Sequence, residues 1–143
     1  MKNNLTPQDL RVGNLVELLT TQSKIVGRTG CYAEVLEIRK DKVQLKYKEH
    51  IFMRKYDSIA PIKINEELLF ELGLKKHEKY NVFLLSNSFA IDYYKGDEFA
   101  IYYLDDQFCE IIRIKYIHQL QNFFYAFTLE EELILKSTIN ERK

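Results

Sequence analysis

Catalysis and metal binding need reactive side chains at set spacings, and this sequence offers few of them. It has three histidines and two cysteines, and none of them lies in a nucleophile or metal-ligand motif. The glycine-rich motifs that bind phosphate are also absent. Cys31 and Cys109 are far apart, and no close pair of Cys or His residues could begin a zinc site. We therefore expect no metal, no cofactor and no enzymatic activity.

Acidic residues gather between positions 92 and 110, and two groups of them fall on predicted hairpin turns. They are Asp92, Asp97, Glu98, Asp105, Asp106 and Glu110. Paired carboxylates can bind Mg²⁺ or act as acid and base. Aspartate is also a common turn residue, so we favour solvated turn tips over a small metal-dependent enzyme.

A basic stretch between residues 39 and 55 could contact an anionic partner. Its cations, set against only two acids, are Arg39, Lys40, Lys42, Lys46, Lys48, Arg54 and Lys55. Strand alternation places Lys42, Lys46 and Lys48 on one exposed face, where they could follow a phosphate backbone. Tyr47 or Phe52 could stack on bases nearby. The competing interpretation is an edge strand whose lysines suppress pairing with other chains.

A helix predicted near the C-terminus has a polar face that could recognise a protein. His118, Asn122 and Tyr125 fall on successive turns at spacings i, i+4 and i+7, and Gln121 flanks them. Tyrosine is enriched at protein contacts. A partner could dock on this face, or another part of the chain could cover it.

Size and composition indicate an ordinary soluble globular protein. The chain has 143 residues, of which 46% are hydrophobic and 29% charged, and 21 basic residues balance 21 acidic ones. The first 60 residues are net positive and the remainder net negative, so nucleic-acid binding stays open for the first half alone. No apolar run approaches the ~20 residues of a membrane helix, and no signal peptide is evident. We expect a cytoplasmic protein without membrane contact, in which both cysteines are small buried hydrophobes.

Residues 1–60 are predicted to form a small, curled antiparallel sheet of the SH3-like kind. A helical turn is expected at Thr6–Asp9, and Lys24–Gly30, which contains two glycines, is expected to be a loop. Strands are predicted at Leu15–Leu19, Tyr32–Arg39, Lys42–Lys48 and Ile51–Arg54. In the third strand, Val43 and Leu45 alternate with polar residues, which indicates one buried and one solvated face.

Residues 61–143 are predicted to hold a helix, a four-stranded antiparallel meander and a C-terminal helix. The first helix follows the N-cap Asn65 and ends at Gly73. The strands are expected at Tyr80–Leu85, Phe89–Tyr94, Phe99–Leu104 and Phe108–Lys115. The last helix spans Tyr116–Phe127, and its stripe of Leu120, Phe123, Phe124 and Phe127 is expected to be buried. The predicted fold class is α+β, with two subdomains, 1–60 and 61–143, that share one core.

Three segments together resemble a group of short uncharacterised proteins from bacteria of the Bacteroides–Flavobacterium kind and from their phages and mobile elements. The segments are Leu10–Asn14, Ile59–Leu74 and Ile114–Thr128, of which Tyr116–Asn122 is the most specific part. The resemblance implies an accessory protein of a mobile element and no particular mechanism. In a phage setting, such proteins often inhibit a host defence complex, anti-CRISPR proteins among them.

These observations lead to two expectations about function. The absence of catalytic motifs, the small size and the two candidate contact surfaces favour a non-enzymatic binding protein that acts through a macromolecular partner, first of all a protein. The alternative is a nucleic-acid-binding module that uses residues 39–55.

Overall fold

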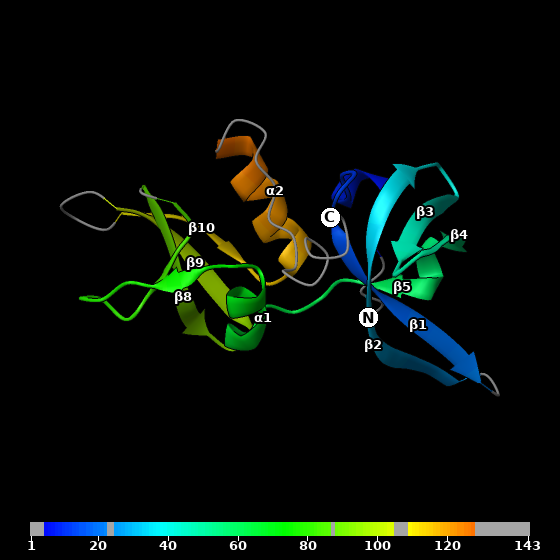
Figure 1. Cartoon of the computed structure of the whole chain (residues 1–143), viewed down its shortest axis with the longest axis horizontal. Coiled ribbons are helices and arrows are strands. Elements are labelled where there is room, and N and C mark those ends of the chain that lie inside the picture. Colours follow the sequence, from blue (N-terminus) through cyan, green and yellow to red (C-terminus); the bar gives the residue numbers. More distant parts are fainter. Residues whose placement is uncertain (1–4, 23–24, 87, 105–108, 128–143) are drawn as a thin grey trace. The chain divides into compact units, whose positions relative to one another are not determined.

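The computed structural model describes residues 5–22, 25–86, 88–104 and 109–127, and the chain divides into two compact units (Figure 1). The units are residues 1–62 and 63–143, so the boundary falls slightly beyond the expected one. Each unit has its own five-stranded antiparallel sheet, and the second also has two helices. The fold class is therefore α+β, as predicted.

The first unit contains five strands and two 3-10 turns. They are η1 (Pro7–Asp9), β1 (Leu15–Gln22), β2 (Ile25–Ile38), β3 (Lys42–Tyr47), β4 (His50–Lys55), η2 (Tyr56–Ser58) and β5 (Ile59–Ala60). Their order across the sheet is β4-β3-β2-β1-β5. The predicted helical turn is present as η1, where the Thr6 N–H donates to Oδ2 of Asp9 at 2.8 Å.

Strand β3 confirms the predicted alternation. Val43 and Leu45 are fully buried, whereas Lys42 is exposed. Val43 and Leu45 pack in one cluster with Val16 and Val35 from the neighbouring strands β1 and β2. Each such side chain contributes roughly 1.5–3 kcal/mol when it leaves water. The first unit thus has a hydrophobic core of its own.

The loop predicted at Lys24–Gly30 is wrong for the residues described there. Residues 25–30 belong to β2, and Gly27 pairs with Thr20 of β1. A bulge interrupts the ladder next to Leu18. Near it, Gly30 has a positive φ of +74°, a backbone conformation that favours glycine. Glycines mark both loops and bulged strands, so only pairing with β1 separates the two cases.

Glu17 of β1 is a buried acid with two hydrogen-bond donors. Nη1 of Arg28 donates to its carboxylate at 2.6 Å, and the Gly30 N–H donates at 3.1 Å. The guanidinium of Arg28 is half-exposed and also reaches the carbonyl oxygen of Pro61 at 3.4 Å. This group of contacts ties β1, β2 and the residue that follows β5 together.

The described residues of the second unit form two helices and five strands. They are α1 (Glu66–Glu71), β6 (Lys75–Lys76), β7 (Phe83–Leu84), β8 (Phe89–Lys95), β9 (Glu98–Tyr103), β10 (Cys109–Ile114) and α2 (Ile117–Phe127). The sheet order is β10-β9-β8-β7-β6, and Figure 1 shows β8, β9 and β10 side by side. Helix α1 has its predicted caps, because Oδ1 of Asn65 accepts from the Leu68 N–H at 2.8 Å and Gly73 has φ of +93°.

The meander is confirmed with changes at one side. The predicted strand at Tyr80–Leu85 shortens to the two residues of β7, and β6 beside it was not predicted. The turn at Gly96 is confirmed, with φ of +60°. The predicted turn at Asp105–Asp106, the first residue of the predicted last strand and the tail from Leu129 lie outside the described residues.

Helix α2 confirms the C-terminal helix but only part of the predicted buried stripe. Leu120 and Phe124 are buried, Phe123 is half-buried, and Phe127 is 55% exposed. The ring of Phe127 makes an edge-to-face contact with Phe89, the first residue of β8. The last turn of α2 therefore lies at the end of this strand. The prediction that Phe127 is buried is therefore wrong. Periodicity gives the direction of a side chain but not the extent of the surface beneath it.

Candidate binding surfaces

The β3–β4 hairpin carries most of the predicted basic residues on its outer face and at its turns. Lys42 and Lys55 are direct cross-strand neighbours, and Lys46 lies farther along the same face. Lys40 precedes β3, and Lys48 lies in the turn that follows it. These five lysines, the basic hairpin, form no ion pair within the described part of the chain. The hairpin therefore gathers five lysines, with Asp41 and Glu49 in its turns and Glu34 of β2 opposite Lys46.

The two arginines of the basic stretch have internal contacts instead. Nε of Arg39 lies 2.9 Å from Oε1 of Glu37, and the hydrogen bond and charge of Arg39 lower the pKa of the Glu37 carboxyl below its usual value. Nη1 of Arg54 donates to the carbonyl oxygen of Leu19 at 2.7 Å. The structure thus separates the seven predicted nucleic-acid-binding residues into five lysines without an ion pair in the described part of the chain and two arginines with internal contacts.

The aromatic residues expected to stack on bases lie on the other face of the hairpin. Tyr47 and Phe52 share the face of Leu45 and pack against the core of the first unit. The guanidinium of Arg54 lies 5.6 Å from the centre of the Phe52 ring. Base stacking on the lysine face by these two rings is therefore not supported.

The predicted polar face of α2 is only partly accessible. His118 and Gln121 are buried, whereas Asn122 and Tyr125 are half-buried. Gln121 lies one turn from Ile117, at the border of the apolar stripe, so burial of the stripe includes it. The His118 ring stacks on the ring of Tyr116 at 5.8 Å. Because they are buried, His118 and Gln121 are not accessible to a partner on this face. The roles of Asn122 and Tyr125 in partner binding stay predictions.

Four aromatic side chains gather where the end of α2 meets β8 and β9. The centre of the Phe89 ring lies 5.3 Å from Phe123, 5.4 Å from Phe127 and 5.6 Å from Tyr103. The rings of Phe123 and Phe127 stack at 4.5 Å. Tyr103 is 44% exposed and Phe127 is 55% exposed. The sequence pattern places Phe123 and Phe127 on the apolar stripe of the helix, but it predicts that both are in the core and not in an exposed aromatic patch.

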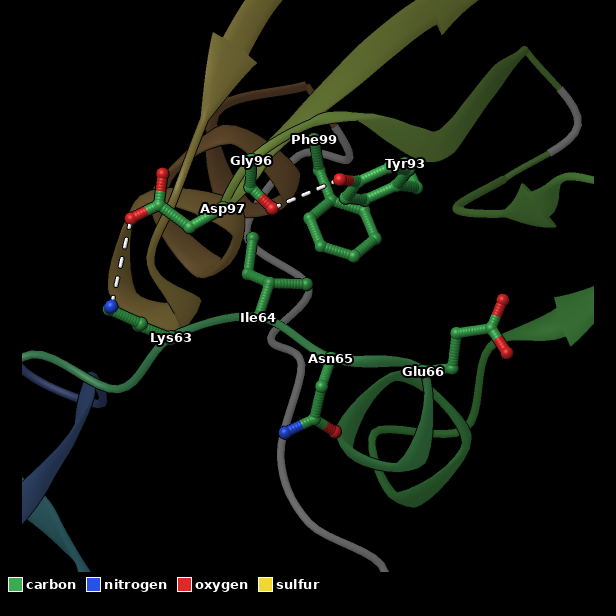
Figure 2. A pocket seen from close by; sticks show the side chains of 8 residues that line it. All are labelled: Lys63, Ile64, Asn65, Glu66, Tyr93, Gly96, Asp97 and Phe99. Carbon is green, nitrogen blue, oxygen red and sulfur yellow. Dashed lines mark hydrogen bonds and ion pairs between the residues drawn. The ribbon is translucent and has the colours of Figure 1, made fainter.

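A hollow of about 460 Å³ lies between the start of α1 and the β8–β9 turn within the second unit (Figure 2). Ile64 and the rings of Tyr93 and Phe99 form its apolar walls. At its rim, Nζ of Lys63 lies 3.7 Å from Oδ2 of Asp97, as Figure 2 shows. The hydroxyl of Tyr93 donates to the carbonyl oxygen of Gly96 at 3.1 Å. Lys63 and Asp97, and Tyr93 and Gly96, thus contact one another at the rim.

The acidic residues near the hairpin turns bind basic side chains of the same unit. Asp97 lies 3.7 Å from Lys63 and 3.9 Å from Lys115, and Glu110 lies 3.2 Å from Arg113. The described residues contain no group of three or more His, Cys, Asp or Glu side chains placed to hold a metal ion. Asp105 and Asp106 lie outside the described residues.

The two cysteines are free thiols in different units. Cys109 is exposed at the start of β10 and Cys31 is half-buried, so the prediction of two buried cysteines is wrong. Hydrogen bonds that involve the side chains of Tyr47 and Thr29 lower the pKa of the Cys31 thiol below its usual value. Strand patterning misplaced Cys109 because β10 is at the margin of its sheet.

Comparison with protein-family models, with curated proteins and with solved structures gives no match. None of the helices in the described ranges is long and apolar enough to cross a membrane. The function has to be inferred from the surfaces themselves.

Proposed function

We propose that this protein is a non-enzymatic, cytoplasmic binding protein that acts through a protein partner. The observation that carries the proposal is the aromatic patch of Phe89, Tyr103, Phe123 and Phe127. Two of its rings are about half exposed, although a buried ring of this size would contribute roughly 1.5–3 kcal/mol. Free thiols in both units fit the reducing conditions of the cytoplasm.

Rigidity and composition favour this patch as a contact surface. Aromatic side chains are enriched at the centres of protein interfaces, where they bury a large area and lose little conformational entropy. Here the rings already restrict one another through edge-to-face and stacked contacts. The resemblance to mobile-element proteins directs the choice of partner to a host defence complex, as for an anti-CRISPR protein.

Replacing Phe127 by serine tests this proposal. Tagged wild-type protein and F127S are used to capture proteins from nuclease-treated extract of the native host, and captured proteins are identified by mass spectrometry. We expect F127S to retain at least tenfold less of a specific partner, because loss of a central aromatic contact costs ~2 kcal/mol or more. The melting temperature of F127S should fall by only a few degrees, since the ring is 55% exposed and its contacts with Phe89 and Phe123 are worth ~1 kcal/mol.

Phe70 provides the matched control. It is 48% exposed on α1 and makes one edge-to-face ring contact, with Phe83 at 4.9 Å. The variant F70S should capture the partner as the wild type does. Equal capture by F127S and the wild type, or equal loss in both variants, would contradict the role of the patch.

The basic hairpin favours a second function, the binding of nucleic acid by the first unit. Five lysines that form no ion pair within the described residues lie on one hairpin, and the face with Lys42 and Lys55 is exposed. We also infer that this unit is an SH3-like barrel. The strand order β4-β3-β2-β1-β5 and the 3-10 turn before β5 support that assignment.

The second function predicts a steep dependence of affinity on salt. If all five lysines neutralise phosphates, a plot of log affinity against log salt concentration should have a slope of about −4.5 on duplex DNA. The triple variant K42Q/K46Q/K55Q should lower the magnitude of that slope by about 3. Fluorescence anisotropy with labelled single- and double-stranded oligonucleotides measures both quantities.

A control for the lysine variant lies in the second unit. The triple variant K75Q/K79Q/K95Q changes the net charge equally at exposed positions of the second unit. Its affinity and slope should match those of the wild type. Equal effects of the two triple variants would indicate attraction by net charge alone, and absence of binding at low salt would exclude the second function.

A further inference from the structure

Strand β10 is the outermost strand of the second sheet and pairs on one side only, with β9. No other described segment pairs with its outer side. The free side of an edge strand presents backbone N–H and C=O groups that can form a hydrogen-bonded ladder with a further strand. β10 is therefore a place where another chain could extend the sheet.

The side chains of β10 are apolar at its centre. Ile111 is 44% exposed and Ile112 is 45% exposed. β-Branched residues favour strands. When such residues are exposed on an edge strand, they promote pairing with other strands. The centre of β10 is thus suited to contact with an apolar strand.

A bulge places the charges of β10 on one face of the sheet. The ladder shifts between Glu110 and Ile112, so Glu110 lies opposite Tyr102 and Arg113 lies opposite Ala100. Tyr102 and Ala100 are two residues apart in β9, so Glu110 and Arg113 point to the same face. Nε of Arg113 lies 3.2 Å from Oε1 of Glu110. One face of the strand therefore has a negative group near its start and a positive group near its end.

We infer that β10 pairs with the same strand of a second copy of this chain, antiparallel about a two-fold axis. The register that sets Ile111 opposite Ile112 also sets Glu110 of each copy opposite Arg113 of the other. One strand thereby supplies an apolar centre and two symmetric ion pairs. Any other register separates both ion pairs, so the charges select this one.

The expected dimer is weak and reversible. Two six-residue strands bury less than the roughly 1,200 Å² of a standard interface. We therefore expect a dissociation constant of about 10–100 µM. In sedimentation equilibrium, the mass-average mass should rise from 17.1 kDa toward twice that value as the concentration passes through this range.

Charge exchange across the two-fold axis tests the register. E110R sets two pairs of arginines against each other in the dimer, and R113E sets two pairs of glutamates against each other. Each variant alone should stay monomeric up to about 500 µM, which is far above the expected constant. An equimolar mixture should dimerise again, because every arginine of one chain then meets a glutamate of the other.

Folding and net charge are controlled separately. The ion pair between Glu110 and Arg113 is exposed, so its loss in E110R should change the melting temperature little. In R113E the melting temperature should fall by a few degrees, because the guanidinium of Arg113 also lies 3.9 Å from the centre of the Tyr94 ring. E71R, an exposed charge reversal on α1, should dimerise as the wild type does. I112K removes the apolar centre and should be monomeric both alone and when mixed with either charge variant.

Three results would overturn the inference. The wild type could remain a monomer up to 500 µM, which would mean that the bulge and charges protect the edge of the sheet. The single charge variants could dimerise as the wild type does. The mixture of E110R and R113E could remain monomeric, although each variant is folded.

Discussion

Replacing Phe124 by alanine is expected to lower the free energy of unfolding by about 3–5 kcal/mol. The Phe124 ring is buried on the side of α2 that also holds Leu120. Its removal leaves a cavity that close-packed neighbours fill only in part. Domains have stabilities of ~5–15 kcal/mol, so the loss should shift the urea midpoint far below that of the wild type. Urea titration followed by far-UV circular dichroism measures the shift.

Phe127, on the same helix, is the matched comparison. F127A removes the same group of atoms from a ring that is 55% exposed. It loses ring contacts with Phe89 and Phe123, which are worth ~1 kcal/mol. Destabilisation of similar size in both variants would contradict the assignment of Phe124 to the core and Phe127 to the surface.

Replacing Arg28 by alanine is expected to cost about 3 kcal/mol, more than replacing Glu17 by glutamine. R28A leaves the Glu17 carboxylate buried with the Gly30 N–H as its remaining donor among these contacts. A buried charge that loses its counter-ion is strongly destabilising. E17Q leaves the Arg28 guanidinium without its anion, but that group is 47% exposed and can be hydrated. We expect E17Q to cost ~1–2 kcal/mol.

The double variant R28A/E17Q separates charge burial from loss of packing. It removes the uncompensated carboxylate, so it should be more stable than R28A alone. Thermal unfolding of the wild type, the two single variants and the double variant completes the cycle. If R28A were no less stable than E17Q, the carboxylate would not depend on Arg28 for its neutralisation.

Local patterns in the sequence predicted most of the secondary structure. The alternation around Val43 and Leu45 located β3, and the residues Asn65 and Gly73 located both ends of α1. These predictions succeeded because one residue or one short period decides the outcome: a cap satisfies a free N–H, and a strand separates its two faces. The turn at Gly96 follows the same rule.

The errors arose where distant parts of the chain decide the structure. Gly27 and Gly30 read as loop residues, but pairing with β1 makes them part of β2. Phe127 was predicted to be buried, although the sheet beneath α2 ends near Phe89. Cys109 has the neighbours of a buried strand but lies at a sheet margin. Neither the pairing partner nor the extent of a sheet is encoded in a local window.

The candidate surfaces divide in the same way. The residue types alone specify which side chains are cationic, aromatic or apolar, and their spacing places five lysines within one hairpin of the chain. Contacts formed on folding give Arg39 and Arg54 their internal partners and bury His118 and Gln121. Folding also brings Phe89 and Tyr103 to the end of α2, and the bulge turns Glu110 and Arg113 to one face of β10. The reason is that side-chain type is a local property, whereas exposure and ion pairing depend on contacts between residues far apart in the chain.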